Sequence, residues 1–464
     1  MDSTIFVLNK SLLQSEVGRI ADEIAKLLQP EGYVRKGRGS KFTYPEGDHF
    51  IGLSFCFELR PRDTLILLEI SKFFEDPNKI PPKLTKDEIS NLAERFLKIV
   101  KRQIPIAPFV IRGLPKSTCD RIEYVLGENK LFGANLILKN GIRRLKIPTA
   151  VHIYYFEEDA QVVPGVYEKL RWTFRGFKIT IKIDTQKFTG KIGAGGINCL
   201  LIKPNSDNAW LEGILKIIEG EDLLIFDYDK LGDGKKWANI VCQILAKNGS
   251  EIWQVHNLDT KTVFVGIDLG HDHARRLSRL CCTFFNGNGT EFRRGKILKI
   301  VGLNEKMSEV QLTKEIQAKL DIINKHYEFQ NLVIHKDGRV LENPEKVYEL
   351  LKGQNKSVSI MEVIKSNSAF VFDLGEGECL DFGTFRLLQT IRPDYQGTVA
   401  RPLKTKLLKS DQDANLLMNQ IYQLSKVYAQ DSIYGQRRLP VTTYIADIFS
   451  SFFLSKKLAA FNRK

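Results

Sequence analysis

Three aspartates lie far apart in the chain, each directly after an apolar segment. Asp268 follows TVFVGI, Asp337 follows NLVIHK and Asp447 follows LPVTTYIA. The first two segments have the composition of buried strands. Strand ends hold carboxylates rigidly, and hard divalent cations such as Mg²⁺ or Mn²⁺ prefer carboxylate oxygens as ligands. The pattern predicts a carboxylate metal site, with simple turn formation as the alternative, because Asp-Gly pairs such as the one after Lys336 favour turns.

The segments around these aspartates predict elements in the order strand, hairpin, helix, strand. We expect a strand at 262–267, a hairpin over 278–300 with Asn-Gly turn residues, a helix at about 307–327 and a strand at 331–335. A helix over 413–429 leads to the segment that carries the last aspartate, which is expected to approach from a helix. This order, with acids at strand ends, is typical of an RNase H-like nuclease core, which cuts phosphodiesters with two divalent ions.

Two other regions precede this core. Residues 1–130 predict a small α+β region, with helices at 11–28 and 86–104 and strands at 49–59 and 64–70. From 131 to 260 the strands GINCLLIKP and DLLIFDY alternate with the helices WLEGILKII and WANIVCQILAKNG. Alternation of this kind predicts a parallel sheet with crossover helices. The chain is therefore expected to be an α/β protein.

Composition restricts the class of partner. The formal net charge is +14 and the pI is about 9.2, which favours a polyanionic partner, although a lysine-rich solvated surface gives the same balance. Basic clusters at 293–296, 401–409 and 436–438 are candidates for contacts with nucleic-acid backbones. No apolar run reaches 18 residues and no secretory signal is recognised. We therefore expect a cytoplasmic protein that does not associate with a membrane. The seven cysteines form no CxxC pair and are expected to be reduced.

The motifs VGIDLGH, VIHKDGR and LPVTTYIAD together resemble the PIWI domain of Argonaute proteins. The resemblance extends over about residues 131–464. It implies a MID-like guide-end-binding domain with a parallel sheet at 131–260 and a PIWI domain, RNase H-like, at 261–464. The N-terminal region, 1–130, is left without a role. The length in front of the MID-like region implies the short, PAZ-lacking prokaryotic class.

The resemblance also implies a catalytic tetrad. In that family three of the tetrad residues match Asp268, Asp337 and Asp447 of this chain, which would hold Mg²⁺ or Mn²⁺. The fourth member is a glutamate on a loop before the long helix. Glu305, Glu309 and Glu315 are the candidates; Glu309 is preferred because it directly precedes the helix that leads to the second aspartate.

A further resemblance concerns the MID-domain helix that binds the 5′ end of a guide. Asn239, Gln243 and Lys247 are spaced by four residues and share one helix face, which offers two amides and a cation to a phosphate. A plain amphipathic helix has the same pattern. Trp210 takes the place of a base-stacking tyrosine, but the lysine that the family pairs with it is absent. This departure predicts weak selection for a 5′ phosphate.

These observations lead to one main hypothesis and two alternatives. The main hypothesis is guide-dependent binding of complementary nucleic acid, RNA or DNA, in host defence, with possible metal-dependent endonuclease cleavage of the target. The first alternative is an inactive guide-loaded sensor that activates a partner effector protein. The second is an RNase H-like nuclease that needs no guide.

Overall fold

The computed structural model divides the chain into two compact units. One comprises residues 1–120 and 363–407, and the other comprises residues 121–362 and 408–464. Residues 363–407, expected from sequence in the third region, fold with the N-terminal residues. The residues that the structure describes are 3–36, 40–74, 84–122, 124–126, 129–131, 142–189, 192, 195–202, 223–227, 234–250, 252, 254–255, 258–272, 276–292, 297–302, 308–337, 343–353, 357–365, 369–392, 399–427 and 438–451.

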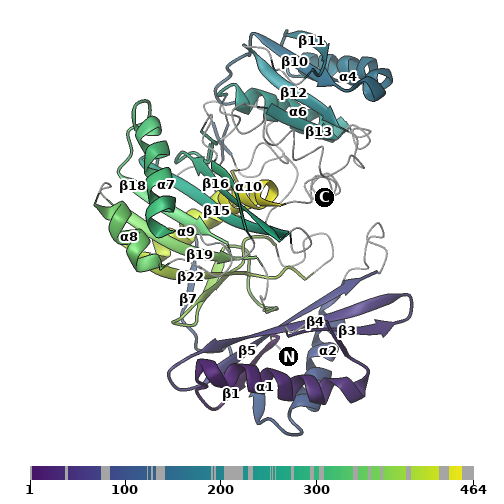
Figure 1. Cartoon of the computed structure of the whole chain (residues 1–464), viewed down its shortest axis with the longest axis vertical. Helices are drawn as coiled ribbons and strands as arrows, with labels where there is room; N and C mark the ends of the chain where they lie inside the picture. The colour runs from purple at the N-terminus through teal and green to yellow at the C-terminus, as the bar shows by residue number, and fades with distance from the viewer. Residues whose placement is uncertain are drawn as a thin grey trace. The chain divides into compact units, whose positions relative to one another are not determined.

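The first unit is built on a six-stranded sheet covered on one face by two helices (Figure 1). Its strand order is β2-β3-β4-β5-β1-β6. The elements are β1 (Ile5–Leu8), α1 (Gln14–Leu28), η1 (Gln29–Glu31), β2 (Val34–Arg35), β3 (Lys41–Glu46), β4 (His49–Leu59), β5 (Thr64–Phe73), α2 (Lys86–Val100) and β6 (Ile106–Pro108). The predicted helices and strands of this region are confirmed, with the ends shifted by a few residues.

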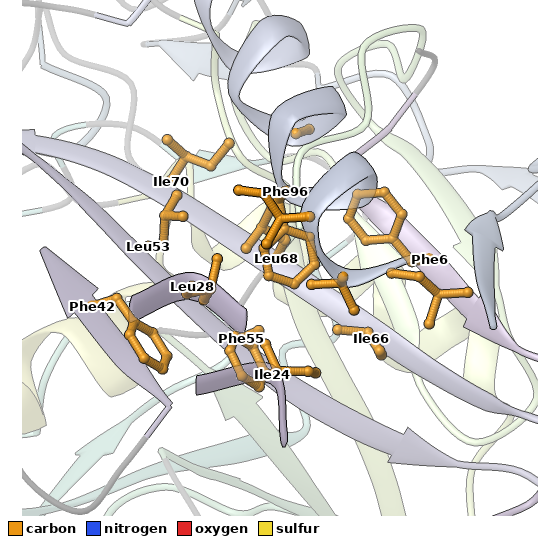
Figure 2. Packing of buried hydrophobic residues seen from close by; sticks show 14 of the residues in the cluster. Phe6, Ile24, Leu28, Phe42, Leu53, Phe55, Ile66, Leu68, Ile70 and Phe96 are labelled. Atoms are coloured by element: carbon orange, nitrogen blue, oxygen red, sulfur yellow. The ribbon is translucent and has the colours of Figure 1, made fainter. Parts of the chain in front are cut away.

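Alternation along the strands determines which side chains meet the helices. Residues 51, 53 and 55 of β4 and 66, 68 and 70 of β5 are apolar and buried, and they pack against the apolar stripes of α1 and α2 (Figure 2). Thr85 begins α2 with a capping box: its hydroxyl accepts from the backbone N–H of Glu88, whose carboxylate accepts from the backbone N–H of Thr85.

The other face of β5 forms a second core in the same unit. Leu65 and Leu67 pack there with Ile5 and with apolar residues between 369 and 387. The strands of this part are β7 (Lys116–Thr118), β20 (Glu378–Asp381) and β21 (Arg386–Leu388). The chain enters the unit within β19 (Ser357–Ile364) and leaves it within β22 (Leu403–Ser410).

The second unit begins with the predicted parallel sheet. Its order is β11-β10-β12-β13, and all three pairings are parallel. The elements are β10 (Ala150–Tyr155), η3 (Glu157–Val162), α4 (Val163–Gly176), β11 (Lys182–Lys187), β12 (Ile197–Ile202), β13 (Leu223–Asp227) and α6 (Gly234–Lys247). Buried side chains of the strands, α4 and α6 form one core. A small sheet contains β14 (Gln254–Val255), β8 (Tyr124–Leu126) and β9 (Asn129–Leu131). The helix expected at WLEGILKII lies outside the described residues.

The remainder of this unit has the predicted RNase H-like connectivity. Five neighbouring strands follow the order β17-β16-β15-β18-β19, antiparallel on one side of β15 and parallel on the other. Their bounds and those of the helices are β15 (Thr262–Asp272), β16 (Leu277–Phe285), β17 (Ile297–Gly302), α7 (Glu309–Asn324), β18 (Asn331–Lys336), α8 (Pro344–Lys352), α9 (Ala414–Leu424) and α10 (Val441–Ser450).

Strand β15 has a different partner on each face. Val263, Val265 and Ile267 pack with apolar residues of α7 and α8. The alternate residues face the opposite side, where α10 packs against β15 and β16. A Cβ built on Gly266 would lie 2.2 Å from the carbonyl oxygen of Thr442, and one on Gly270 would lie 2.1 Å from that of Ser450. Only glycine at these two positions lets the backbone of α10 come so close.

Two further expectations are tested by the structure. All seven cysteines are free thiols, as predicted. None of the helices described above is long and apolar enough to cross a membrane.

Gly266→Ala should destabilise the second unit, because the added methyl group must displace α10 or the strand. Overpacking of this kind costs about 1–3 kcal/mol, so we expect a lower thermal midpoint by calorimetry. Gly18→Ala is the matched control. Nothing lies within 4 Å of a Cβ at Gly18 in α1, and alanine there should stabilise the helix by about 1 kcal/mol. Equal midpoints for Gly266→Ala and the wild type would contradict the close approach.

Candidate functional site

The first two aspartates are neighbours across the β15–β18 pairing, although β15 does not end before Asp268 as expected but continues to Asp272, where it still pairs with β16. Strands β15 and β18 are parallel, with Ile267 opposite Lys336 in the register. The backbone N–H of Asp337 donates to the carbonyl oxygen of Ile267 at 2.9 Å, which extends the pairing by one residue. Asp268 and Asp337 therefore lie side by side on strands about 4.8 Å apart. Both side chains are on the α10 face of the sheet.

The third aspartate is on the helix that covers this face. Asp447 is half-buried in the last turns of α10. Three residues later, the hydroxyl of Ser450 donates to Oδ2 of Asp268 at 2.5 Å. Residues three apart share a face of a helix, so Asp447 is on the side of α10 that meets Asp268. Sequence reasoning missed Ser450; the alternating Gly-Ile-Asp-Leu-Gly motif was the available sign that a backbone approaches here.

The carboxylates of Asp268 and Asp337 are suitable ligands for a hard divalent cation, but among the described residues a third ligand is not grouped with them. Asp268 and Asp337 are only 6% and 9% exposed, and two neighbouring buried carboxylates repel each other unless a positive charge lies close. Carboxylate oxygens are the ligands that Mg²⁺ and Mn²⁺ prefer. Within the described ranges, however, no three His, Cys, Asp or Glu side chains are grouped closely enough to hold a metal. The aspartate pair fits one cation; a complete cluster is not assembled.

The candidate glutamate is engaged elsewhere. Glu309 is the first residue of α7, and Oε1 of its carboxylate accepts from the backbone N–H of Asn343 at 3.1 Å, at the start of α8. Nζ of Lys346 lies 3.8 Å from Oε2. The backbone N–H of Asn343 contributes most to holding the pKa of the Glu309 carboxyl below its ordinary value. Glu305 lies outside the described residues, and Glu315 pairs with Lys299.

The predicted guide-end residues fall partly outside what is described. Trp210 lies outside the described ranges, as does the side chain of Asn239, although its backbone is in α6. Gln243 is half-buried on α6. Lys247, the last residue of the helix, has its Nζ 3.4 Å from Oε2 of Glu291, and these side chains are only 9% and 4% exposed. A carboxylate therefore already neutralises the cation that was expected to meet a phosphate.

A buried histidine fixes the other end of α10. Nδ1 of His335 lies 2.9 Å from Oγ1 of Thr442, and Nε2 has no hydrogen-bond partner among the residues that the structure describes. Burial lowers the pKa of His335 to about 3. The hydroxyl of Thr283 donates to the carbonyl oxygen of Thr442 at 3.2 Å. These contacts hold the start of the helix against β16 and β18. Neither threonine was identified from the sequence.

Other basic residues are involved in ion pairs. In the first unit Arg401 pairs with Glu69, and Lys404 and Lys406 both pair with Glu58. Lys409 in the second unit pairs with Glu345, and Arg438 is half-buried. Residues 293–296, 436 and 437 lie outside the described ranges.

Two curated proteins match part of the sequence, although no protein-family model does. Over 189 residues the chain is 29% identical to Protein argonaute of Marinitoga hydrogenitolerans. Over 193 residues it is 30% identical to the protein of that name from Marinitoga piezophila. These segments cover 39% and 40% of this chain but 28% and 29% of the relatives, so the matches span less than a third of either relative.

Similarity to solved structures extends over nearly the whole chain. Marinitoga piezophila Argonaute, solved with a 5′ OH guide RNA and target DNA, aligns at TM-score 0.65 and 15% identity over 94% of this chain and 85% of that one. The chain has an Argonaute fold. Clostridium butyricum Argonaute, bound to a guide DNA and a 19-mer target DNA, gives 0.63 at 13% identity (95% and 86% covered). Drosophila Piwi gives 0.64 at 10% identity (95% and 84% covered).

The Argonaute fold accounts for the α/β architecture predicted from the sequence. The low identity means that similarity of fold does not assign roles to individual residues. The roles of the aspartates, of Glu309 and of the guide-end residues therefore rest on the contacts and burial described above.

Acidification should destabilise the second unit through His335. The unfolded chain binds a proton at this histidine below about pH 6.5, whereas the folded chain does so only near pH 3. The contribution of neutral, buried His335 to the free energy of unfolding is thus intact above pH 6.5. It is lost as the pH falls towards 3, by up to about 1.4 kcal/mol per pH unit. His335→Gln should flatten the pH dependence of the unfolding free energy measured in urea. His326→Gln, at an exposed histidine, should keep the wild-type profile; equal slopes for all three proteins would refute the assignment.

Proposed function

We propose that this protein binds a guide strand and uses it to recognise complementary nucleic acid. The Argonaute fold, the sequence similarity to two Marinitoga Argonautes and the net charge of +14 support this function. In this proposal residues 131–260 form a MID-like domain, and residues 261–464 supply the PIWI domain except for 363–407, which fold with the N-terminal residues. Base pairing to the guide supplies the specificity. A role in host defence and membership of the short, PAZ-lacking class remain predictions from the sequence.

We also propose that the site formed around Asp268 and Asp337 cleaves the target strand. The observation that carries this proposal is that Asp268, within β15, lies beside Asp337, directly after β18, beneath the helix of Asp447. Asp268 and Asp337 would hold Mg²⁺ or Mn²⁺; the three aspartates together are not grouped closely enough in this structure to hold an ion, so Asp447 is proposed as a third ligand only once an ion is bound. A bound divalent ion supplies charge stabilisation and an activated water. The carboxylates orient the ion from rigid elements, and α10 excludes solvent from one side of the sheet.

The nature of the guide end can also be proposed. Marinitoga piezophila Argonaute has been solved with a 5′ OH guide RNA and target DNA. In this chain Lys247 is paired with Glu291 in a buried contact, so an incoming phosphate would have to displace a carboxylate or lie close to it. We infer that this protein accepts a guide with a 5′ hydroxyl better than one with a 5′ phosphate.

A guide-loaded sensor without cleavage is the second candidate. It is favoured by the position of Glu309, which is bonded to the start of α8, and by the lack of a three-residue metal group in the described part of the chain. In that case recognition would be signalled to a partner effector protein.

Asp337→Asn tests cleavage. Purified protein is incubated with guide, labelled target and Mn²⁺, and products are resolved by length. A single cut opposite a fixed guide position should fall by at least about 100-fold in the variant, because losing several kcal/mol of metal-derived stabilisation corresponds to that factor. Asp321→Asn, on the exposed side of α7, should cut normally. Guide-dependent binding without any cut in the wild type would favour the sensor.

Glu291→Gln tests the guide end. Removing the carboxylate should leave Lys247 able to attract a phosphate and should raise the affinity for a 5′-phosphorylated guide about tenfold relative to a 5′-hydroxyl guide. Affinities are measured by filter binding at fixed salt. Glu345→Gln, which removes another lysine-paired acid of the same unit, is the control and should leave the ratio unchanged. A ratio unaffected by Glu291→Gln would place the phosphate contact elsewhere.

A further inference from the structure

Ser450 makes a short contact with a candidate metal ligand. The distance from its Oγ to Oδ2 of Asp268 is 2.5 Å, and the two residues are 1% and 6% exposed. Both residues are buried, so this bond between a hydroxyl and a carboxylate is shielded from solvent, where hydrogen bonds are stronger than in water.

The hydroxyl has a choice between two acceptors. Its Oγ is also 3.2 Å from the carbonyl oxygen of Asp447, one turn earlier in α10. A serine has a single hydrogen to donate. A carboxylate is a stronger acceptor than a carbonyl group, which favours Asp268. The bond holds one oxygen of that carboxylate and thereby fixes the orientation of its plane.

The position of Ser450 is itself fixed by the sheet. Its carbonyl oxygen lies where a side chain on Gly270 would be. In the next residue, the carbonyl oxygen of Ser451 accepts from Nη1 of Arg279 at 2.9 Å, and this arginine on β16 is buried. A cation at the C-terminal end of a helix also interacts favourably with the helix dipole. The end of α10 is thus held by two neighbouring strands.

We propose that Ser450 is a positioning residue, which orients the Asp268 carboxylate for a divalent cation and ties it to the helix that carries Asp447. This inference rests on the metal site of the proposed function. Ser450 itself does not bind the cation. It acts through Asp268, as hydrogen-bonding partners of metal ligands commonly do, and the loss of such partners lowers metal affinity by about 10–100-fold.

The test compares Mn²⁺ binding by Ser450→Ala and the wild type, measured by isothermal titration on full-length protein. We expect the dissociation constant to rise about 10–100-fold. Ser450→Thr, which keeps the hydroxyl, should restore most of the affinity. Ser425→Ala is the matched control, because Ser425 is a buried serine that follows a helix of the same unit and donates to the carbonyl oxygen three residues earlier, at 2.6 Å. Among the described residues, it is bonded to no carboxylate.

Thermal midpoints separate positioning from a folding defect. Ser450→Ala and Ser425→Ala should lower the midpoint similarly, while only the former weakens Mn²⁺ binding. Wild-type affinity in Ser450→Ala would overturn the inference and leave the metal site standing. Absence of Mn²⁺ binding in the wild type, or wild-type binding that is unchanged by Asp337→Asn, would instead overturn the metal site itself, and the inference with it.

Discussion

The arrangement of the candidate site depends on the close approach of helix α10 to strand β15. At Gly266 and Gly270 there is room for a carbonyl oxygen of the helix but not for a Cβ. Asp268 lies between these glycines on the same face of the strand, because alternate residues of a strand share a face. The aspartate is therefore held directly beneath the helix, and its partner Asp337 is aligned by the parallel register. Packing of a backbone against a backbone thus positions the carboxylates.

Polar contacts on the two ends of α10 complete this arrangement. At its start, Thr442 meets His335 and Thr283. At its end, the bond from Ser450 to Asp268 joins the helix to the strand. Buried polar groups need partners to remain in the interior, so these contacts favour one position of the helix over small displacements. The carboxylates require such precision, since ligands of a metal must be held within fractions of an ångström.

Much of the fold could be predicted because its signals are local. The strands at 262–267 and 331–335, the Asn-Gly hairpin and the helices of the N-terminal region each have a periodicity or turn chemistry that does not need distant residues. The inclusion of 363–407 in the first unit could not be predicted, because the strands concerned pair with residues hundreds of positions away. The paired state of Lys247 was equally hidden: a lysine on a helix face has the same appearance in sequence whether it meets Glu291 or a phosphate.

The sequence by itself determined that an aspartate follows the apolar run of each of the two parallel strands, that an α/β fold surrounds them and that the chain resembles an Argonaute; that β15 continues past Asp268 to Asp272 is visible only in the structure. Residue type and periodicity act over a few positions, and these properties need nothing more. Only the tertiary structure decided that Asp268 and Asp337 are adjacent, that Ser450 contacts the first of them, and that Glu309 is bonded to the start of α8. Those contacts join residues 34 to 182 positions apart. Such pairings are set by sheet register and helix packing, which no local pattern specifies.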